Sequence, residues 1–209
     1  QGSVSDLEKA VSDAVSGAVG AQSLPDIFST YADTAYAVQK EDKLADLSSY
    51  FTEEELSEYV DSYIKEGYFH DDTSLYLFPV AKSTEIMMIN KTDWKPFADA
   101  TGSSLEELST LEGVADVAKR YYEWTDSLTP DIPDDGKAFY GRDSMSNYFI
   151  IGMKQMGVDL FDVKDGKVTI QADKEKIRRL WDNYYVPYVN GYFASFGKFR
   201  SDDVKTGDI

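Results

Sequence analysis

The sequence contains no cysteine and a single histidine, His70. Without cysteine the chain has no disulfide, no thiolate nucleophile and no Cys-ligated zinc, and one histidine does not build a multi-histidine metal site. No stretch approaches the roughly 20 continuous apolar residues that a membrane-spanning helix needs. These absences exclude cysteine-based catalysis, histidine-rich metal centres and a membrane helix within the given residues.

Basic residues are scarce relative to acidic ones. The chain has 21 Lys and Arg against 38 Asp and Glu, and its formal net charge is −17. The halves on either side of residue 82 are both acidic, so neither is a basic arm. Because this field repels phosphate backbones and anionic membrane surfaces, nucleic acid is not an expected partner.

Hydrophobic residues make up 42% of the 209 residues and aromatic residues 14%, with 15 tyrosines among them. This content is too high for a disordered acidic chain. A chain of this length can bury roughly 70% of its unfolded surface without cross-links. We therefore expect a folded protein made of one large domain or two small ones.

The first part of the chain alternates helical and extended patterns, which predicts an α/β fold. Ser5 and Glu8 are spaced as a capping box for a first helix, and Thr52 and Glu55 as one for a helix that ends at Gly67. Short apolar runs predict strands at Leu24–Thr30, Leu75–Val80 and Glu85–Ile89.

The second part continues the alternation. Apolar spacing and turn residues predict helices and strands in the following order: a helix from Ser104 to about Trp124, a strand at Lys137–Tyr140, a helix at Ser146–Met156, a hairpin at Phe161–Ile170 turning at Asp165-Gly166, and a helix capped by Asp173 and ended by Pro187.

Three apparent motifs favour ordinary structural roles. Gly191–Lys198 has the wrong glycine spacing for a phosphate loop, and Phe199 stands where a hydroxyl has to reach magnesium. Asp131–Arg142 lacks the ligands of a calcium loop at two positions. His70 is typical of an exposed loop histidine. Paired carboxylates for glycoside hydrolysis stay open, since 38 candidates give that test no power.

The order of several segments is similar to that of a known family. The chain resembles the extracellular solute-binding proteins of ABC transporters, specifically the sugar-type, maltose-binding-like family. No single segment is specific, but their order and distances together carry the resemblance over about residues 5 to 209: Leu24-Pro25-Asp26-Ile27-Phe28, Lys43-Leu44-Ala45-Asp46-Leu47, Phe78-Pro79-Val80-Ala81, Ile89-Asn90-Lys91, and Asp203-Val204-Lys205-Thr206-Gly207-Asp208.

The resemblance implies a two-lobed, periplasmic-binding-protein-like (type II) α/β fold that closes on a ligand between its lobes. Residues 4–82 would form part of the N-terminal lobe and residues 83–209 part of the C-terminal lobe, with a hinge crossing near 82–86. By the family pattern we expect the chain to be incomplete at both ends. Gln1-Gly2-Ser3 is typical of the remnant of a cleaved expression tag.

Polar and aromatic side chains that follow the expected strands are the candidate ligand contacts. Ligands of open α/β sheets bind at the carboxyl ends of strands, and a sugar needs hydroxyl acceptors together with flat aromatic faces. Asp33 also matches the place of a ligand-bonding acid in the family, and the last two candidates below are carried over from the resemblance alone. The predicted site consists of Tyr31, Asp33, Lys82, Ser83, Thr84, Asn147 and Tyr148.

The resemblance implies a non-enzymatic, extracellular and monomeric protein that captures a small solute, most naturally a carbohydrate, and delivers it to an ABC transporter permease. No cofactor is required. The full-length protein is expected to be lipid-anchored to the cell membrane, or periplasmic. Three alternatives stay open: the same fold with a polyamine, a peptide or another small solute; a carboxylate-based glycoside hydrolase; and a surface interaction module without a small-molecule pocket.

Overall fold

The chain divides into two compact units, Gln1–Ile86 and Met87–Ile209. The structure is a computed structural model that describes residues 3–69, 73–164 and 167–209. Within these ranges no helix is long and apolar enough to cross a membrane. The lobe boundary expected between residues 82 and 83 lies shortly before the division between the units, and it stays a prediction.

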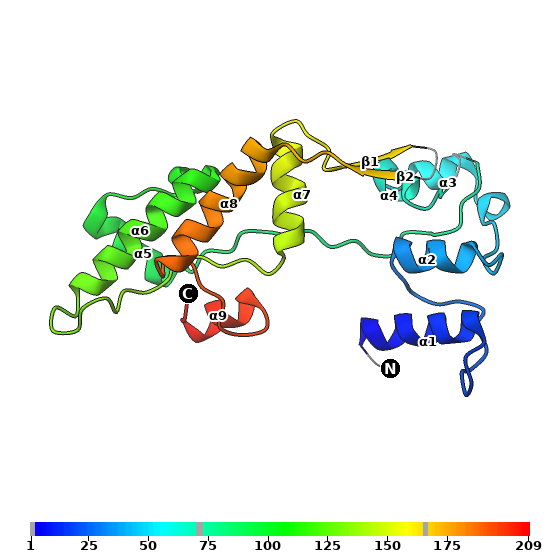
Figure 1. The fold of residues 1–209 in the computed structure, drawn as a ribbon, viewed down its shortest axis with the longest axis horizontal. Coiled ribbons are helices and arrows are strands. Elements are labelled where there is room, and N and C mark those ends of the chain that lie inside the picture. The colour runs from blue at the N-terminus through cyan, green and yellow to red at the C-terminus, as the bar shows by residue number, and fades with distance from the viewer. Residues whose placement is uncertain (1–2, 70–72, 165–166) are drawn as a thin grey trace. The chain divides into compact units, whose positions relative to one another are not determined.

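The first unit is built from short helices. Helices α1 and α2 pack against each other and bury Val11, Ala35 and Val38 (Figure 1). The elements are α1 (Val4–Ser16), α2 (Ala32–Gln39), a 3-10 helix (Ser48–Tyr50), α3 (Glu53–Ser57) and α4 (Asp61–Lys65).

Capping side chains define the helix starts in this unit. The capping box of α3, formed by Thr52 and Glu55, is confirmed. The box predicted for α1 is wrong by two residues, because Ser3 and Asp6 cap the helix instead. The single helix predicted up to Gly67 is interrupted, since Val60 adopts an extended conformation between α3 and α4.

The strands predicted in this part of the chain do not form. Leu24–Thr30 is an irregular segment in which Ile27 is 91% exposed, and 85–89 has no strand either. In 75–80 only Leu75 pairs, through an isolated bridge to Tyr68. A strand needs a continuous hydrogen-bonded neighbour, and among the described residues these runs have at most the one bridge of Leu75, so apolar composition alone misled the prediction.

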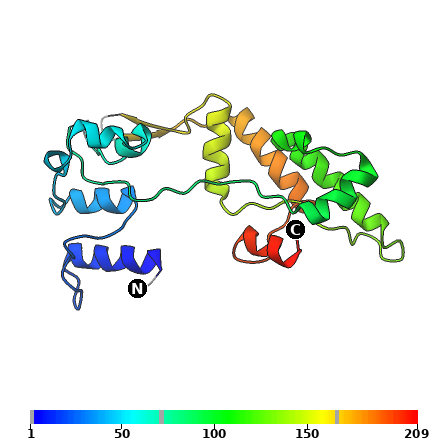
Figure 2. The same cartoon turned by 180° about the vertical axis from the view of Figure 1, so that it is seen from behind.

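The second unit is a stack of helices with one hairpin. Helix α6 packs between α5 and α8, and α8 also packs against α7, as both views show (Figures 1 and 2). The elements are α5 (Lys91–Thr101), a 3-10 helix (Leu105–Ser109), α6 (Leu111–Ser127), α7 (Met145–Gln155), β1 (Phe161–Lys164), β2 (Lys167–Ile170), α8 (Lys174–Val189) and α9 (Arg200–Thr206).

Two apolar clusters hold this unit together. The first joins α5 to α6 around the fully buried Phe97 and Val117. The second joins α7 to α8 through Tyr148, Met153 and Leu180. Helix α8 therefore packs against both α6 and α7. These two contacts determine which face of α8 lies toward the loop before α7.

Several sequence predictions hold in this unit. Helix α7 lies within one residue of its predicted bounds, and Asp173 caps α8 by accepting hydrogen bonds from the amides of Glu175 and Lys176. The hairpin is confirmed as an antiparallel pair with Phe161 opposite Ile170. Its predicted turn, Asp165-Gly166, lies outside the described residues.

Other predictions fail here. Helix α5 was not predicted, and the helix expected from Ser104 is divided at Thr110, which caps α6. Helix α8 does not stop at Pro187 but continues to Val189. The ring of Pro187 is buried, and its carbonyl accepts hydrogen bonds from the amides of Tyr192 and Phe193, which join the last turn of α8 to the segment that follows it.

The segment Lys137–Tyr140 is not a regular strand. It makes a single parallel bridge, between Tyr140 and Phe193. The amide of Phe139 donates to the carbonyl of Tyr192, and the amide of Ala194 donates to the carbonyl of Tyr140, both at 2.9 Å. These bonds fix the start of the loop that leads into α7.

Candidate functional site

Arg142, in the loop from Tyr140 to Met145, contributes to the lining of two cavities of the second unit. The loop is anchored at one end by the parallel bridge of Tyr140. At the other end the side chain of Ser144 caps α7 by accepting a hydrogen bond from the amide of Asn147 at 3.1 Å. A loop held at both ends presents its side chains in a defined arrangement.

The aromatic cavity, as we call the first of these, has a volume of about 370 Å³. Four of its aromatic side chains follow one another on one face of α8 at helical spacing. The rings of Trp181 and Tyr185 are stacked, with centroids 5.1 Å apart and planes 22° apart, and they are 49% and 46% exposed. The lining residues are Arg142, Asp143, Met145, Trp181, Tyr184, Tyr185, Tyr188 and Ser195.

Asp143 supplies the carboxylate of the aromatic cavity. Its Oδ1 atom accepts a hydrogen bond from the backbone amide of Arg200 at 2.7 Å and another from the Arg200 Nε at 3.3 Å. About half of the Asp143 side chain is exposed. The cavity therefore combines flat apolar faces with a charged hydrogen-bond acceptor.

The larger cavity, the second of the two, measures about 500 Å³. The buried ring of Tyr148 forms part of its wall, and the Arg142 guanidinium lies 5.3 Å from the centroid of that ring. The Tyr148 hydroxyl donates to the carbonyl of Leu180 at 2.7 Å. Burial raises the pKa of the Tyr148 phenol far above its ordinary value.

Glu112 forms the polar edge of the larger cavity. Its Oε1 atom accepts hydrogen bonds from the Asn183 side-chain amide at 2.9 Å and from the Arg179 Nε at 2.8 Å. These contacts, with that from Asn183 the strongest, lower the pKa of the Glu112 carboxyl. The three side chains satisfy one another, so this edge is a structural link between α6 and α8.

Replacing Tyr148 by phenylalanine tests the role of its hydroxyl. We expect Tyr148→Phe to cost about 1 kcal/mol of stability at pH 7, because the hydrogen bond to Leu180 is lost. Because the pKa of Tyr148 is higher in the folded protein than in the unfolded chain, it contributes stability that is fully present at pH values below the unfolded-chain pKa of about 10. This contribution is lost as the pH rises above that pKa. Tyr148→Phe should therefore lose less stability than the parent between pH 8 and pH 10.5.

Urea unfolding at several pH values measures this difference. Tyr50→Phe, at a ring that is 74% exposed, is the matched control and should behave as the parent does. An equal alkaline loss in the parent and in Tyr148→Phe would contradict the assignment.

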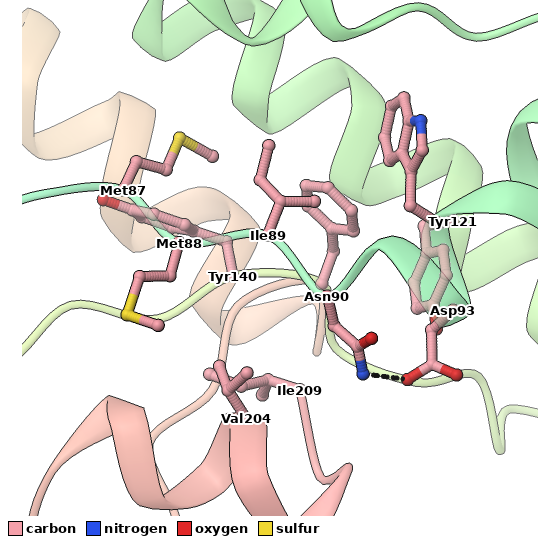
Figure 3. A pocket seen from close by; sticks show the side chains of 11 residues that line it. Met87, Met88, Ile89, Asn90, Asp93, Tyr121, Tyr140, Val204 and Ile209 are labelled. Carbon is pink, nitrogen blue, oxygen red and sulfur yellow. Dashed lines mark hydrogen bonds between the residues drawn. The ribbon is translucent and has the colours of Figure 1, made fainter.

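A third cavity lies around the segment 87–90 and measures about 50 Å³ (Figure 3). Val204 and Ile209 approach that segment from α9 and the residues after it, and the Asn90 side-chain amide donates to the Asp93 carboxylate at 2.7 Å. Solute sites usually enclose at least about 300 Å³, so we do not assign a solute to this small cavity.

The predicted contacts at the start of α2 are solvent-exposed. Tyr31 is the N-cap residue of α2 and is 63% exposed. Asp33 lies in the first turn, where its carboxylate accepts a hydrogen bond from the amide of Thr34 at 2.8 Å. Both side chains are accessible, and neither lines one of the three cavities described above.

The predicted hinge residues divide into an ion-paired lysine and two exposed hydroxyls. Lys82 is ion-paired with Glu66 and lies 5.9 Å from the centroid of the Tyr63 ring. Ser83 and Thr84 are exposed. The positive charge of Lys82 is thus already compensated within the first unit.

The three cavities described above are lined by one of the seven predicted residues. Tyr148 lines the larger cavity with its buried ring, whereas the neighbouring Asn147 is exposed in the first turn of α7. Within the described ranges, no group of three or more His, Asp or Glu side chains is arranged to hold a metal ion. The prediction for His70 lies outside these ranges.

Sequence reasoning missed the residues of the aromatic cavity. Within the helix predicted after Asp173, Trp181, Tyr185 and Tyr188 form an aromatic stripe at spacings of four and three residues. This spacing is visible in the sequence and indicates an aromatic face next to the core face. Nothing in the sequence pairs that face with Asp143, because the two are joined only by the fold.

Comparison with known protein families shows which family the chain belongs to. The model of the bacterial extracellular solute-binding protein family matches residues 3–209, and the chain belongs to this family. Comparison with curated proteins and with solved structures gives no significant match. Membership indicates extracellular solute binding for ABC transport, a role that is typically non-enzymatic, and the helix-rich structure fits an α/β periplasmic-binding-like fold.

Proposed function

We propose that this protein captures a carbohydrate outside the cell for delivery to an ABC transporter permease, and that the aromatic cavity contacts the sugar. The observation that carries the proposal is the stacked pair Trp181 and Tyr185 beside the carboxylate of Asp143. The transport role follows from family membership. The lining of the aromatic cavity supports a carbohydrate as the solute.

The chemistry of a sugar matches this combination of groups. A pyranose ring has apolar C–H faces, which pack on flat aromatic rings, and hydroxyl groups, which donate to carboxylates. Asp143 uses Oδ1 to accept from Arg200, and within the described part of the chain its Oδ2 atom accepts no hydrogen bond. That oxygen is the acceptor we assign to a ligand hydroxyl.

The size of the cavity also fits a small carbohydrate. A volume of about 370 Å³ lies within the usual range for small-molecule sites. Ser195 and Arg142 add a hydroxyl and a guanidinium to the lining, and hydroxyl-rich ligands use both kinds of group. The binding surface is therefore mixed, as a neutral sugar requires.

The contacts expected from the sequence stay part of the proposal. The exposed residues Tyr31, Asp33, Ser83, Thr84 and Asn147 are proposed ligand contacts, and Lys82 would join them only by leaving Glu66. Tyr148 is proposed to act through Arg142, which lies over its ring. A two-lobed type II arrangement, a monomeric state and a lipid-anchored or periplasmic location complete the proposal.

Tryptophan fluorescence tests the proposed site directly. Of the three tryptophans Trp181 is the most exposed, since Trp94 is buried and Trp124 half-buried. Titration with a panel of disaccharides and trisaccharides is expected to change the emission of Trp181 and to raise the melting temperature. Trp181→Phe should remove the fluorescence response while it retains most of the affinity.

Trp181→Ala is expected to weaken carbohydrate binding about tenfold, which corresponds to roughly 1.4 kcal/mol of lost stacking. Calorimetry measures this loss without a fluorescent reporter. Tyr50→Ala removes an aromatic ring that is more exposed than Trp181 and lines none of the described cavities, and it should bind as the parent does. Equal affinities of Trp181→Ala and the parent would reject the aromatic cavity as the sugar site.

The acidic balance of the chain favours one competing solute class. With a net charge of −17, a polyamine would be attracted to the protein at long range. Spermidine therefore belongs in the same panel, measured at 0.15 M salt to screen non-specific attraction. Stabilisation by spermidine without any response to the sugars would overturn the carbohydrate proposal and favour the polyamine.

A further inference from the structure

A buried ion pair lies directly behind the carboxylate of the aromatic cavity. Arg200 and Asp203 are 8% and 2% exposed, and their charged groups are in contact. Taking two charges out of water costs several kcal/mol per ion, and apolar residues of similar volume often stabilise a protein as well or better. Stability alone therefore does not explain why a buried ion pair lies next to Asp143.

The contacts of Arg200 connect three segments. Its backbone amide and its Nε atom both donate to Oδ1 of Asp143. The two terminal nitrogens bind elsewhere, Nη1 to Asp203 and Nη2 to the carbonyl of Gly197 at 2.5 Å. The guanidinium is therefore fixed by groups that do not line the cavity, while the Nε and the amide hold one oxygen of Asp143.

Asp203 in turn is held by backbone amides. Its carboxylate accepts hydrogen bonds from the amides of Phe196 at 3.1 Å and of Gly197 at 2.6 Å. Burial acts to raise the pKa of Asp203, but these bonds and the Arg200 charge together outweigh it and hold the pKa below its ordinary value. Asp203 thus stays ionised at neutral pH and keeps Arg200 in place.

We propose that Arg200, locked by Asp203, is a positioning residue that orients Asp143 for carbohydrate binding in the aromatic cavity. This inference rests on the proposed function. Both Arg200 donors engage the same oxygen, so they fix the rotation of the carboxylate and leave Oδ2 to the ligand. Arg200 itself is not among the residues that line the cavity.

A double-mutant cycle separates positioning from a general structural role. Arg200→Lys keeps the charge but lacks the Nε donor and the fork that binds Gly197. We expect it to weaken sugar binding about tenfold when Asp143 is present, and to cause no further loss in an Asp143→Ala background. Its effect on unfolding by urea should persist in both backgrounds, since the contacts to Asp203 and Gly197 are independent of Asp143.

Arg120→Lys is the matched control. Arg120 is also partly buried in the second unit, where it donates to Ser103 at 2.8 Å and pairs with Glu107, away from the aromatic cavity. We expect it to lower stability without changing sugar affinity. Losses of affinity that simply add in the Arg200→Lys and Asp143→Ala double variant would overturn the positioning role.

A ligand-free measurement keeps this inference separate from the proposed function. The carboxyl ¹³C resonance of Asp143 should shift in Arg200→Lys and in Asp203→Asn but stay in place in Arg120→Lys. Asp203→Asn serves as the second variant if Arg200→Lys does not fold. A shifted resonance in a protein that binds no sugar would reject the proposed function alone, whereas an unchanged resonance in a sugar-binding protein would reject the positioning role alone.

Discussion

Phe97→Ala is expected to lower the free energy of unfolding of the second unit by about 3–5 kcal/mol, the usual cost of removing a large aromatic side chain from a core. The Phe97 ring is fully buried in the cluster between α5 and α6. It makes edge contacts with Trp94 and Tyr121, with ring centroids 5.5 and 5.2 Å apart, and a tilted contact with Trp124 at 5.7 Å. All of these contacts are lost together in the alanine variant.

Urea unfolding followed by tryptophan fluorescence measures this effect, because two of the three tryptophans touch Phe97. Phe161→Ala is the matched control, since Phe161 lies on the hairpin and is 48% exposed. We expect that variant to cost about 0.5 kcal/mol or less. A loss below about 1.5 kcal/mol in Phe97→Ala would mean that the α5–α6 cluster repacks and is not the core of this unit.

Gly141→Ala is expected to destabilise the second unit by about 1–3 kcal/mol, the typical cost of overpacking. A Cβ atom at this position would lie 2.4 Å from the carbonyl oxygen of Ala194 and 2.7 Å from the Arg200 Cδ. The carbonyl belongs to the backbone that pairs with Tyr140, so the chain has to separate there. The variant displaces the loop that carries Asp143 as well.

Denaturant titration of Gly141→Ala beside Ser201→Ala tests this expectation. Ser201 is exposed and adjacent to Arg200, so its truncation should change stability by less than about 0.5 kcal/mol. Under the proposed function Gly141→Ala also weakens sugar binding, because Arg200 is pushed away from its position behind Asp143. Parent-like stability of Gly141→Ala would show that the close approach of the two segments is not obligatory.

Local signals in the sequence predicted the elements that local interactions form. The Thr52 and Asp173 caps are hydrogen bonds between residues two or three positions apart, and the spacing of such residues is read directly from the sequence. Helix α7 and the hairpin were predicted for the same reason, since their patterns have short periods. The missed helix α5 contains Pro96 and opens at Asn90, two residues that are usually interpreted as signals for a turn.

Extended segments were the weak part of the prediction. Leu24–Thr30 and 85–89 contain short apolar runs, but a strand exists only where another segment supplies hydrogen bonds. The parallel bridge of Tyr140 to Phe193 joins segments more than fifty residues apart, and no local pattern encodes that pairing. The expectation of strands was therefore wrong where it rested on a short apolar run and no continuous pairing segment is present among the described residues.

The sequence by itself determined the excluded chemistry, the caps at Thr52 and Asp173 and the resemblance to solute-binding proteins, because each of these depends on residue types and short spacings. The tertiary structure decided which side chains meet. Arg200 and Asp143 are 57 residues apart, and α8 follows the loop of Asp143 only after the hairpin. Contacts at such separations are set by the packing of α7 and α8 around Tyr148 and Leu180, a three-dimensional fit that single positions do not reveal.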